Sequence, residues 1–104
     1  MTRGDVYRIR LPRSRGREQA GPRYGVIVQA DELLGLSTAI VAPTSRSAAA
    51  AIFRPEIELH NESTRVLLEQ LRAVDIERLE KFAGRLTSAE QQAVDDALTL
   101  VLDL

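Results

Sequence analysis

The sequence of 104 residues contains no cysteine and only one histidine, His60. Without cysteine there is no disulfide framework, no thiolate zinc site, no iron–sulfur cluster and no cysteine nucleophile. A two-histidine acid–base pair is impossible, and a Ser-His-Asp triad is disfavoured. We therefore expect no metal and no cofactor, and an enzyme of this sequence would use arginine, carboxylate and hydroxyl groups.

Long apolar runs are also missing. No stretch approaches the roughly 18 consecutive apolar residues of a membrane span, and the N-terminus lacks the apolar segment of a signal peptide. We therefore expect a cytoplasmic protein without a membrane partner. The apolar and charged fractions, 44% and 28%, are those of a globular protein. The length predicts a single domain over residues 1–104 with one hydrophobic core.

Lysine is almost absent, because all but one of the 14 basic residues are arginine and the exception is Lys81. Seven of the arginines lie within residues 1–25, where only two acidic residues accompany them, although the net charge of the chain is −1. The guanidinium fork suits bidentate contact with phosphate oxygens. The charge pattern fits an anion-binding surface and an ordinary solvated, arginine-rich surface equally well.

Hydrophobic periodicity indicates short β-strands over the first two-thirds of the chain. Residues 5–11 alternate as in a half-buried strand, whereas residues 25–31 and 37–43 are continuous apolar runs typical of buried central strands. A single helical turn is expected over residues 75–79. Three further strands are expected over residues 52–59, 65–70 and 81–86.

The C-terminus predicts an α-helix. Thr87-Ser88-Ala89-Glu90 has the pattern of a capping box. Apolar residues at positions 93, 94, 97, 98, 101 and 102 then form one stripe at helical spacing, which predicts a core face or a subunit contact. Short strands with one terminal helix indicate a mainly β fold, either a small, partly open barrel or a strongly curved antiparallel sheet.

Four segments carry a family resemblance when they are taken in register. They are RGDVY at residues 3–7, GREQAGPR at 16–23, VAPTS at 41–45, and LLEQLRAVD at 67–75, which is followed by Arg78-Leu79 and Gly84-Arg85-Leu86. These segments resemble the first strand, the G-x-E-Q-x-G-x-R loop, the third strand with its threonine, and the last strands of the MazF/PemK (Kid) family of toxin endoribonucleases. Each motif alone is weak, but together they span essentially the whole chain.

The resemblance implies an SH3-like barrel of the CcdB/MazF type with a C-terminal helix, acting as a homodimer. It also implies a toxin that cuts single-stranded RNA at short sequences without metal, leaving a 2′,3′-cyclic phosphate and a 5′-hydroxyl. The implied partner is a cognate MazE-like antitoxin that blocks the RNA groove with an extended, often acidic segment. Cyclising cleavage requires the ribose 2′-OH, so DNA could not be a substrate.

Two catalytic residues are carried over from the family. Arg23 matches the loop arginine, and its guanidinium is expected to hold two phosphate oxygens and stabilise the phosphorane. We assign it no acid or base role, because arginine stays protonated in proteins. Thr44 matches the strand-end threonine, whose hydroxyl would either donate to a phosphate oxygen or position the 2′-OH. For Arg23, the alternative is an ordinary surface arginine or a salt bridge to Glu18. For Thr44, the alternative is a threonine that caps a turn.

Glu18 and Glu69 are the candidates for the base that accepts the 2′-OH proton. The alternative roles, a loop-bracing salt bridge for Glu18 and a cross-strand ion pair for Glu69, are equally compatible with the sequence. His60 reads as a loop histidine, and Tyr24 as a core residue or a ring for base stacking. A further set of polar residues is expected to bind RNA, namely Arg17, Gln19, Ser45, Gln70 and Arg72.

The sequence departs from the family pattern at two positions. Tyr24 stands where many members have proline, and Leu67 stands where some relatives have a catalytic arginine, which leaves more of the chemistry to Arg23 and Thr44. Two other functions remain open: a CcdB-type toxin that inhibits DNA gyrase by binding it, and a barrel that binds RNA without cleaving it. The loop over residues 16–23 favours the ribonuclease, because a gyrase inhibitor would not need Arg23 or Thr44.

Overall fold

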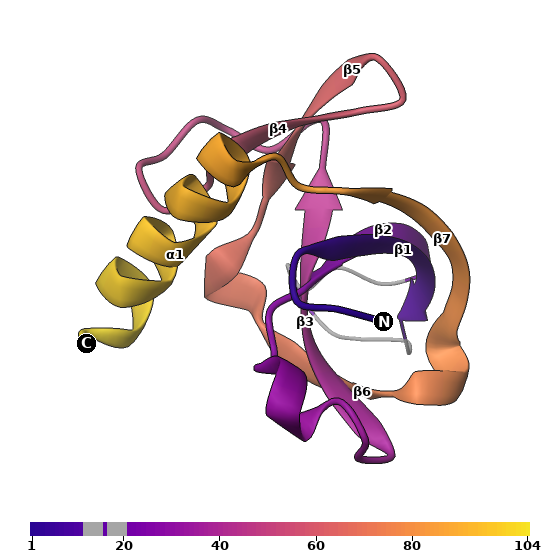
Figure 1. The fold of residues 1–104 in the computed structure, drawn as a ribbon. Coiled ribbons are helices and arrows are strands. Elements are labelled where there is room, and N and C mark those ends of the chain that lie inside the picture. The colour runs from indigo at the N-terminus through magenta and orange to yellow at the C-terminus, as the bar shows by residue number, and fades with distance from the viewer. Residues whose placement is uncertain (12–15, 17–20) are drawn as a thin grey trace.

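The computed structural model describes residues 1–11, 16 and 21–104 (Figure 1). Three candidate site residues, Arg17, Glu18 and Gln19, lie outside the described residues. The elements of the described chain are β1 (Asp5–Leu11), β2 (Gly21–Ile27), η1 (Asp31–Leu33), β3 (Thr38–Ser45), β4 (Glu56–Leu59), β5 (Glu62–Val66), η2 (Leu68–Gln70), β6 (Arg72–Asp75), η3 (Ile76–Arg78), β7 (Leu79–Arg85) and α1 (Ser88–Leu102), where η marks a 3-10 turn.

The strands form one curled antiparallel sheet in the order β4-β5-β3-β2-β1-β7, with β6 beside β3 (Figure 1). The eight-residue strand β3 is the centre of this arrangement. One edge of β3 pairs with β2, while the other edge pairs first with β6 and then, over Thr44 and Ser45, with β5. The curl therefore brings the end of β3 next to the β4–β5 hairpin. This architecture confirms the predicted curved, mainly β fold with one C-terminal helix.

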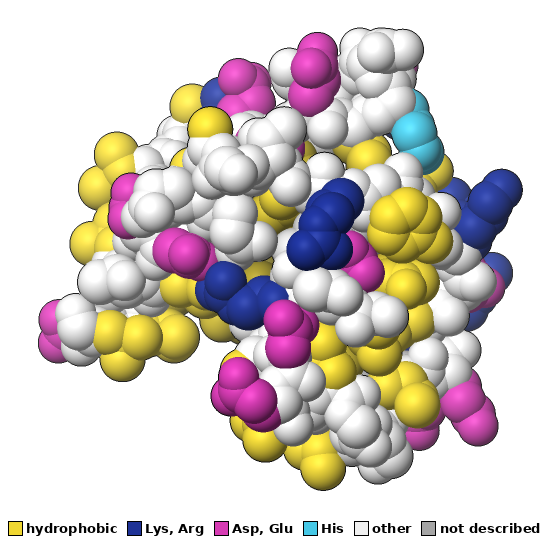
Figure 2. Space-filling model, viewed as in Figure 1, with side chains coloured by type: hydrophobic (Ala, Val, Ile, Leu, Met, Phe, Trp, Pro, Cys, Tyr) yellow, Lys and Arg dark blue, Asp and Glu magenta, His cyan; other side chains and the backbone are white. Residues whose placement is uncertain are grey.

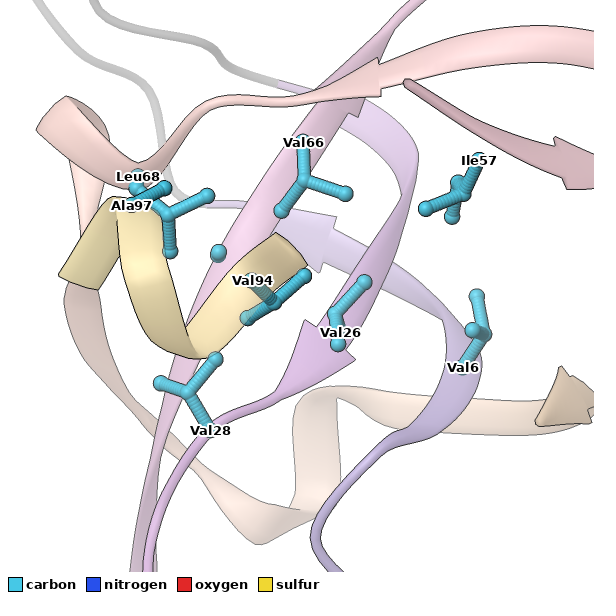
Figure 3. Close-up of a cluster of buried hydrophobic side chains, with 9 residues drawn as sticks. Val6, Val26, Val28, Ile57, Val66, Leu68, Val94 and Ala97 are labelled. Carbon is cyan, nitrogen blue, oxygen red and sulfur yellow. The ribbon is translucent and has the colours of Figure 1, made fainter. Parts of the chain in front are cut away.

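Two buried hydrophobic clusters stabilise the sheet. In the first, Val94 and Ala97 of α1 pack against sheet residues that include Val26 (Figure 3). In the second, residues on the other face of the sheet, including Ile9 and Ile27, pack together inside the curl. Because neighbouring side chains of a strand point to opposite faces, Val26 and Ile27 enter different clusters. Burial on both faces explains why residues 25–28, at the end of β2 and just after it, form a continuous apolar run.

Several predicted boundaries were wrong. The strand expected over residues 52–59 is reduced to β4, because the chain over 51–54 is a turn and Pro55 cannot donate to a ladder; Ile52 is 84% exposed. The strand expected over 65–70 ends at Val66, and Leu68–Gln70 forms a 3-10 turn. A short apolar run in the sequence does not distinguish a β-strand from a turn or a short helical segment. The strand expected over 25–31 is displaced toward the N-terminus. Hydrophobic periodicity did not predict β6, which lies within the segment 67–75 that resembles the last strands of the family.

The local predictions at the C-terminal end of the chain were correct. The turn expected over 75–79 is η3, and the side chain of Asp75 caps it by accepting from Glu77 N. The capping box before α1 is present: Glu90 N donates to Thr87 Oγ1 at 3.1 Å, and Thr87 N donates to Glu90 Oε1 at 2.9 Å. Of the apolar stripe, Val94 and Ala97 are buried. No helix in the described residues has the length and apolar character that a membrane crossing requires.

Candidate active site

An open pocket of ≈ 260 Å³ lies where β2 passes between β1 and the end of β3, beside the β4–β5 hairpin. We call it the Arg23 pocket. Two predicted catalytic residues and one predicted RNA-binding residue line it together, namely Arg23, Thr44 and Ser45. Its other lining residues are Arg8, Tyr24, Arg46, Leu59, His60, Glu62 and Thr64.

The register of β2 and β3 places Thr44 beside the residue that follows Arg23. Gly25 pairs with Pro43, so the antiparallel register sets Thr44 opposite Tyr24. The Thr44 hydroxyl donates a 3.0 Å hydrogen bond to the Tyr24 carbonyl, and Thr44 is 5% exposed. Arg23 is exposed, and no described carboxylate forms an ion pair with it. The pocket thus combines a fixed hydroxyl with an accessible guanidinium.

The described lining of the pocket carries more positive than negative charge. Arg8 from β1, Arg23 from β2 and Arg46 after β3 face a single carboxylate, Glu62. Glu62 forms an exposed ion pair with Arg46. Arg8 lies over the Tyr24 ring, with its guanidinium carbon 5.8 Å from the ring centroid. Such a pocket favours an anionic ligand, and guanidinium groups are well suited to phosphate.

Tyr24 and His60 form an aromatic wall of the pocket. Their rings meet edge to face, with centroids 5.5 Å apart. His60 and Asn61 make the two-residue turn between β4 and β5, in which Leu59 pairs with Glu62. Both turn residues have positive φ angles, 53° and 64°, as a type I′ hairpin turn requires. The sequence placed His60 in a loop but did not predict its presence in the pocket, because no local pattern reports the β2–hairpin contact.

Ser45 and Glu69 have different surroundings. Ser45 is buried in the Arg23 pocket, and its hydroxyl lies 3.3 Å from that of Ser47. Glu69 lies in η2 outside that pocket, where its carboxylate forms a 2.6 Å ion pair with Arg54. It lines a second hollow with Gln70, Leu71 and Arg72. The described structure therefore does not bring Glu69, Gln70 or Arg72 to Arg23 and Thr44.

The two departures from the family pattern have different consequences. Tyr24 contributes its carbonyl to Thr44 and its ring to the pocket wall. Leu67 is 1% exposed and belongs to the interior.

Within the described ranges, no group of three or more histidine, aspartate or glutamate side chains is arranged to hold a metal ion.

Solved structures share this fold. The structure of MazF from Deinococcus radiodurans superposes with a TM-score of 0.87 at 19% identity, covering 100% of this chain and 97% of that chain. A mycobacterial endoribonuclease in complex with its cognate antitoxin gives a TM-score of 0.86 at 17% identity, covering 100% of this chain and 96% of that one. The fold is thus that of the MazF toxins, an SH3-like curved sheet with a terminal helix.

Sequence comparisons define the family. Residues 2–102 match the family described as PemK-like, MazF-like toxin of type II toxin-antitoxin system. Endoribonuclease MazF9 of Mycobacterium tuberculosis is 31% identical over 116 residues, which cover 100% of this chain and 98% of that protein. The chain belongs to the PemK/MazF family of toxins, as its four motifs indicated.

Proposed function

We propose that this chain is the toxin of a toxin–antitoxin pair and acts as a metal-independent, sequence-specific endoribonuclease on single-stranded RNA. The observation that carries the proposal is the shared pocket of Arg23 and Thr44, in which the hydroxyl is fixed on the backbone of the residue next to the arginine. Membership of the PemK/MazF family and the similarity to an endoribonuclease support it. The products would be a 2′,3′-cyclic phosphate and a 5′-hydroxyl.

Arg23 acts on the charge of the transition state in this proposal. When the 2′-oxygen attacks phosphorus, negative charge grows on the non-bridging oxygens of the phosphorane. An exposed guanidinium without a described ion-pair partner can direct two N–H donors at those oxygens. Stabilisation of charge that develops only during the reaction raises the rate of the chemical step.

Thr44 positions the attacking group. Its hydroxyl proton is already donated to the Tyr24 carbonyl, so its oxygen presents lone pairs to the pocket. Those lone pairs can accept a hydrogen bond from the substrate 2′-OH and orient it toward phosphorus. Of the two roles considered for this residue, the observed hydrogen bond favours positioning of the 2′-OH over donation to phosphate.

The remaining predicted residues extend the RNA contact. Ser45 adds a hydroxyl to the Arg23 pocket. Gln70 and Arg72 would hold RNA outside the pocket, beside Glu69 in the second hollow. Arg17, Glu18 and Gln19, from the loop that precedes Arg23, stay predictions of the sequence.

We also propose a cytoplasmic homodimer that a MazE-like antitoxin inhibits. Hydrophobic side chains gather around the C-terminal end of α1 (Figure 2). Exposed residues there include Leu100, Leu102 and Leu104, and a hollow beside them is lined by Ile40 and Leu98. This surface suits a second subunit. The complex of the mycobacterial endoribonuclease with its antitoxin supports inhibition by a partner whose acidic segment would occupy the positively charged pocket.

The test is cleavage of a long RNA by the purified protein in EDTA, followed by mapping of the new ends. Discrete cuts that bear cyclic phosphate, and that disappear when the ribose at the cut site is replaced by deoxyribose, are expected. Intact RNA together with inhibited supercoiling by gyrase would contradict the proposal and favour a CcdB-type toxin. A gel shift without cuts would identify a protein that only binds RNA.

A further inference from the structure

We infer that His60 is the general base that accepts the 2′-OH proton during RNA cleavage. The inference rests on the proposed ribonuclease function and assigns a step that the sequence left open between Glu18 and Glu69. The Glu69 carboxylate is held by Arg54 outside the Arg23 pocket. His60, in contrast, lines the pocket together with Arg23 and Thr44.

The fold places the His60 ring by means of a tight turn. A type I′ hairpin turn requires positive φ at both central positions, a conformation that glycine adopts freely and that asparagine, aspartate and histidine adopt more often than other residues. His60 occupies the first of these positions, with φ of 53°. The turn aims the imidazole at the pocket, where its ring meets Tyr24 at 5.5 Å between centroids.

The other described groups that face His60 are poorer proton acceptors near neutral pH. They come from every neighbouring element: Arg8 from β1, Arg23 and Tyr24 from β2, Arg46 after β3, and Glu62 from β5. Guanidinium groups stay protonated, and a phenol is already protonated near neutral pH. The Glu62 carboxylate is engaged by Arg46. Imidazole is the side chain that exchanges protons between pH 5 and 8.

In the proposed cleavage, His60 accepts one proton and water donates one. The 2′-OH first donates its single proton to Thr44 Oγ1, which orients the group. That proton then passes to neutral imidazole of His60 while the 2′-oxygen forms a bond to phosphorus and Arg23 holds the phosphate oxygens. The bond from phosphorus to the 5′-oxygen breaks, and water supplies the proton that makes the 5′-hydroxyl. The imidazolium then returns its proton to solvent, so the enzyme is unchanged after each cleavage.

The test uses two variants that keep the turn. Asparagine and glycine both adopt positive φ readily, so His60→Asn and His60→Gly should fold with melting temperatures close to that of the wild type. Single-turnover cleavage of an RNA oligonucleotide carrying the mapped cut site is measured from pH 5 to 9. Each variant should lose about 10²- to 10⁴-fold in rate, the usual contribution of general acid–base catalysis. Added imidazole should restore part of the activity of His60→Gly.

The pH profile distinguishes a base from a structural residue. Wild-type cleavage should rise with pH as the imidazole loses its proton and then level off, and this step should be absent from His60→Asn. The control is Asn61→Gly, which changes the other turn residue, outside the pocket, and should cleave like the wild type. Full activity of both His60 variants would overturn the inference. So would slow variants whose cleavage rate still rises with pH as in the wild type and is not restored by imidazole.

A second substrate distinguishes a general base from a general acid. When the bridging 5′-oxygen at the cut site is replaced by sulfur, the leaving group needs no proton. The defect of His60→Asn should persist on this substrate, and its disappearance would make His60 the acid and overturn the assignment. If the wild-type chain itself leaves RNA intact, the proposed function fails. If the wild type cleaves and the variants match it, only the inference about His60 fails.

Discussion

Arg23 and Thr44 differ in exposure, and this difference separates their effects on activity from their effects on stability. The Arg23 side chain is exposed and has no described ion-pair partner, so its removal costs the fold little. Thr44 is buried, and its hydroxyl satisfies the backbone carbonyl of Tyr24. A substitution at Thr44 is therefore expected to change the stability of the fold as well as the rate of RNA cleavage.

At Arg23, substitution should affect catalysis alone. Arg23→Ala should lower the rate of cleavage by about 10²- to 10³-fold, the usual loss when one donor to a developing oxyanion is removed. The melting temperature should not change measurably. Arg10→Ala, an exposed arginine of β1 outside the pocket, is the charge-matched control and should retain full activity. A large loss of stability in Arg23→Ala would instead assign the residue a structural role.

Thr44 should show a combined effect. Thr44→Val keeps the shape of the side chain but leaves the Tyr24 carbonyl without its buried donor, which should cost about 1–3 kcal/mol in the free energy of unfolding. Cleavage should also be lost, because no oxygen remains to orient the 2′-OH. Thr44→Ser keeps the hydroxyl and should preserve most of both properties. Denaturant unfolding and single-turnover cleavage measure the two effects, and an active Thr44→Val would exclude the positioning role.

At the scale of elements, Glu90 connects α1 to the sheet. One of its carboxylate oxygens accepts from Thr87 N in the capping box, and the other accepts from Glu58 N of β4 at 2.8 Å. The start of the helix and the strand that leads into the His60 turn are therefore held by one side chain. The capping box thus does more than begin a helix, because it also holds the hairpin that lines one side of the Arg23 pocket.

This double role predicts an order of stabilities. Thr87→Ala removes one cap and should cost about 1 kcal/mol in the free energy of unfolding. Glu90→Ala removes acceptors for two backbone N–H groups and should cost more. Thr87→Ser, which retains the capping hydroxyl, is the control and should be nearly neutral. Urea titration gives the ranking, and equal losses in Thr87→Ala and Glu90→Ala would show that the bond to β4 contributes nothing.

At the scale of the whole molecule, an ion pair joins the N-terminal segment to α1. Arg3 donates to Asp95 at 2.7 Å, and Gln91 also donates to that carboxylate. Burial acts to raise the pKa of Asp95, but the hydrogen bonds from Arg3 and Gln91 and the charge of Arg3 outweigh it, so the pKa lies below its ordinary value of 3.8. The folded state therefore favours the ionised carboxylate.

A pKa lowered by folding predicts acid sensitivity. The stabilisation by Asp95 should be complete above the unfolded pKa, near 3.8, and should be lost as pH falls through the lower folded value. Asp95→Asn should be less stable than the wild type at pH 6, and the difference should shrink toward pH 2. Thermal unfolding across this range measures it. Asp96→Asn, at an exposed neighbour on α1, is the control and should lose less stability than Asp95→Asn at pH 6, and equal losses in the two variants would contradict the assignment.

The positive pocket predicts that RNA binding weakens with salt. Each phosphate contact on a single strand contributes about 0.7 to the slope of log Kd against log salt, because counterions are released. Binding of an RNA with deoxyribose at the cut site avoids cleavage during the measurement. Arg8→Ala should remove one phosphate contact and so lower the slope by about 0.7. Lys81→Ala, outside the pocket, should leave the slope unchanged. A flat response would exclude this pocket as the docking surface.

The amino-acid sequence by itself predicted the features that depend on neighbouring residues. The period of β1, the single turn at η3 and the capping box of α1 follow from local hydrogen bonds and alternation. The four motifs in register also indicated the family and, through it, Arg23 and Thr44. Strand ends and β6 were not predictable in this way, because a partner strand decides where a ladder begins and stops.

The set of side chains that share the pocket depends on tertiary contacts. The curl of the sheet sets Thr44 on the carbonyl of Tyr24 and brings His60 over from a hairpin that is remote in sequence. The same packing turns Glu69 toward Arg54 and away from Arg23. Contacts of this kind depend on sheet register and twist, which involve residues far apart along the chain and leave no local pattern.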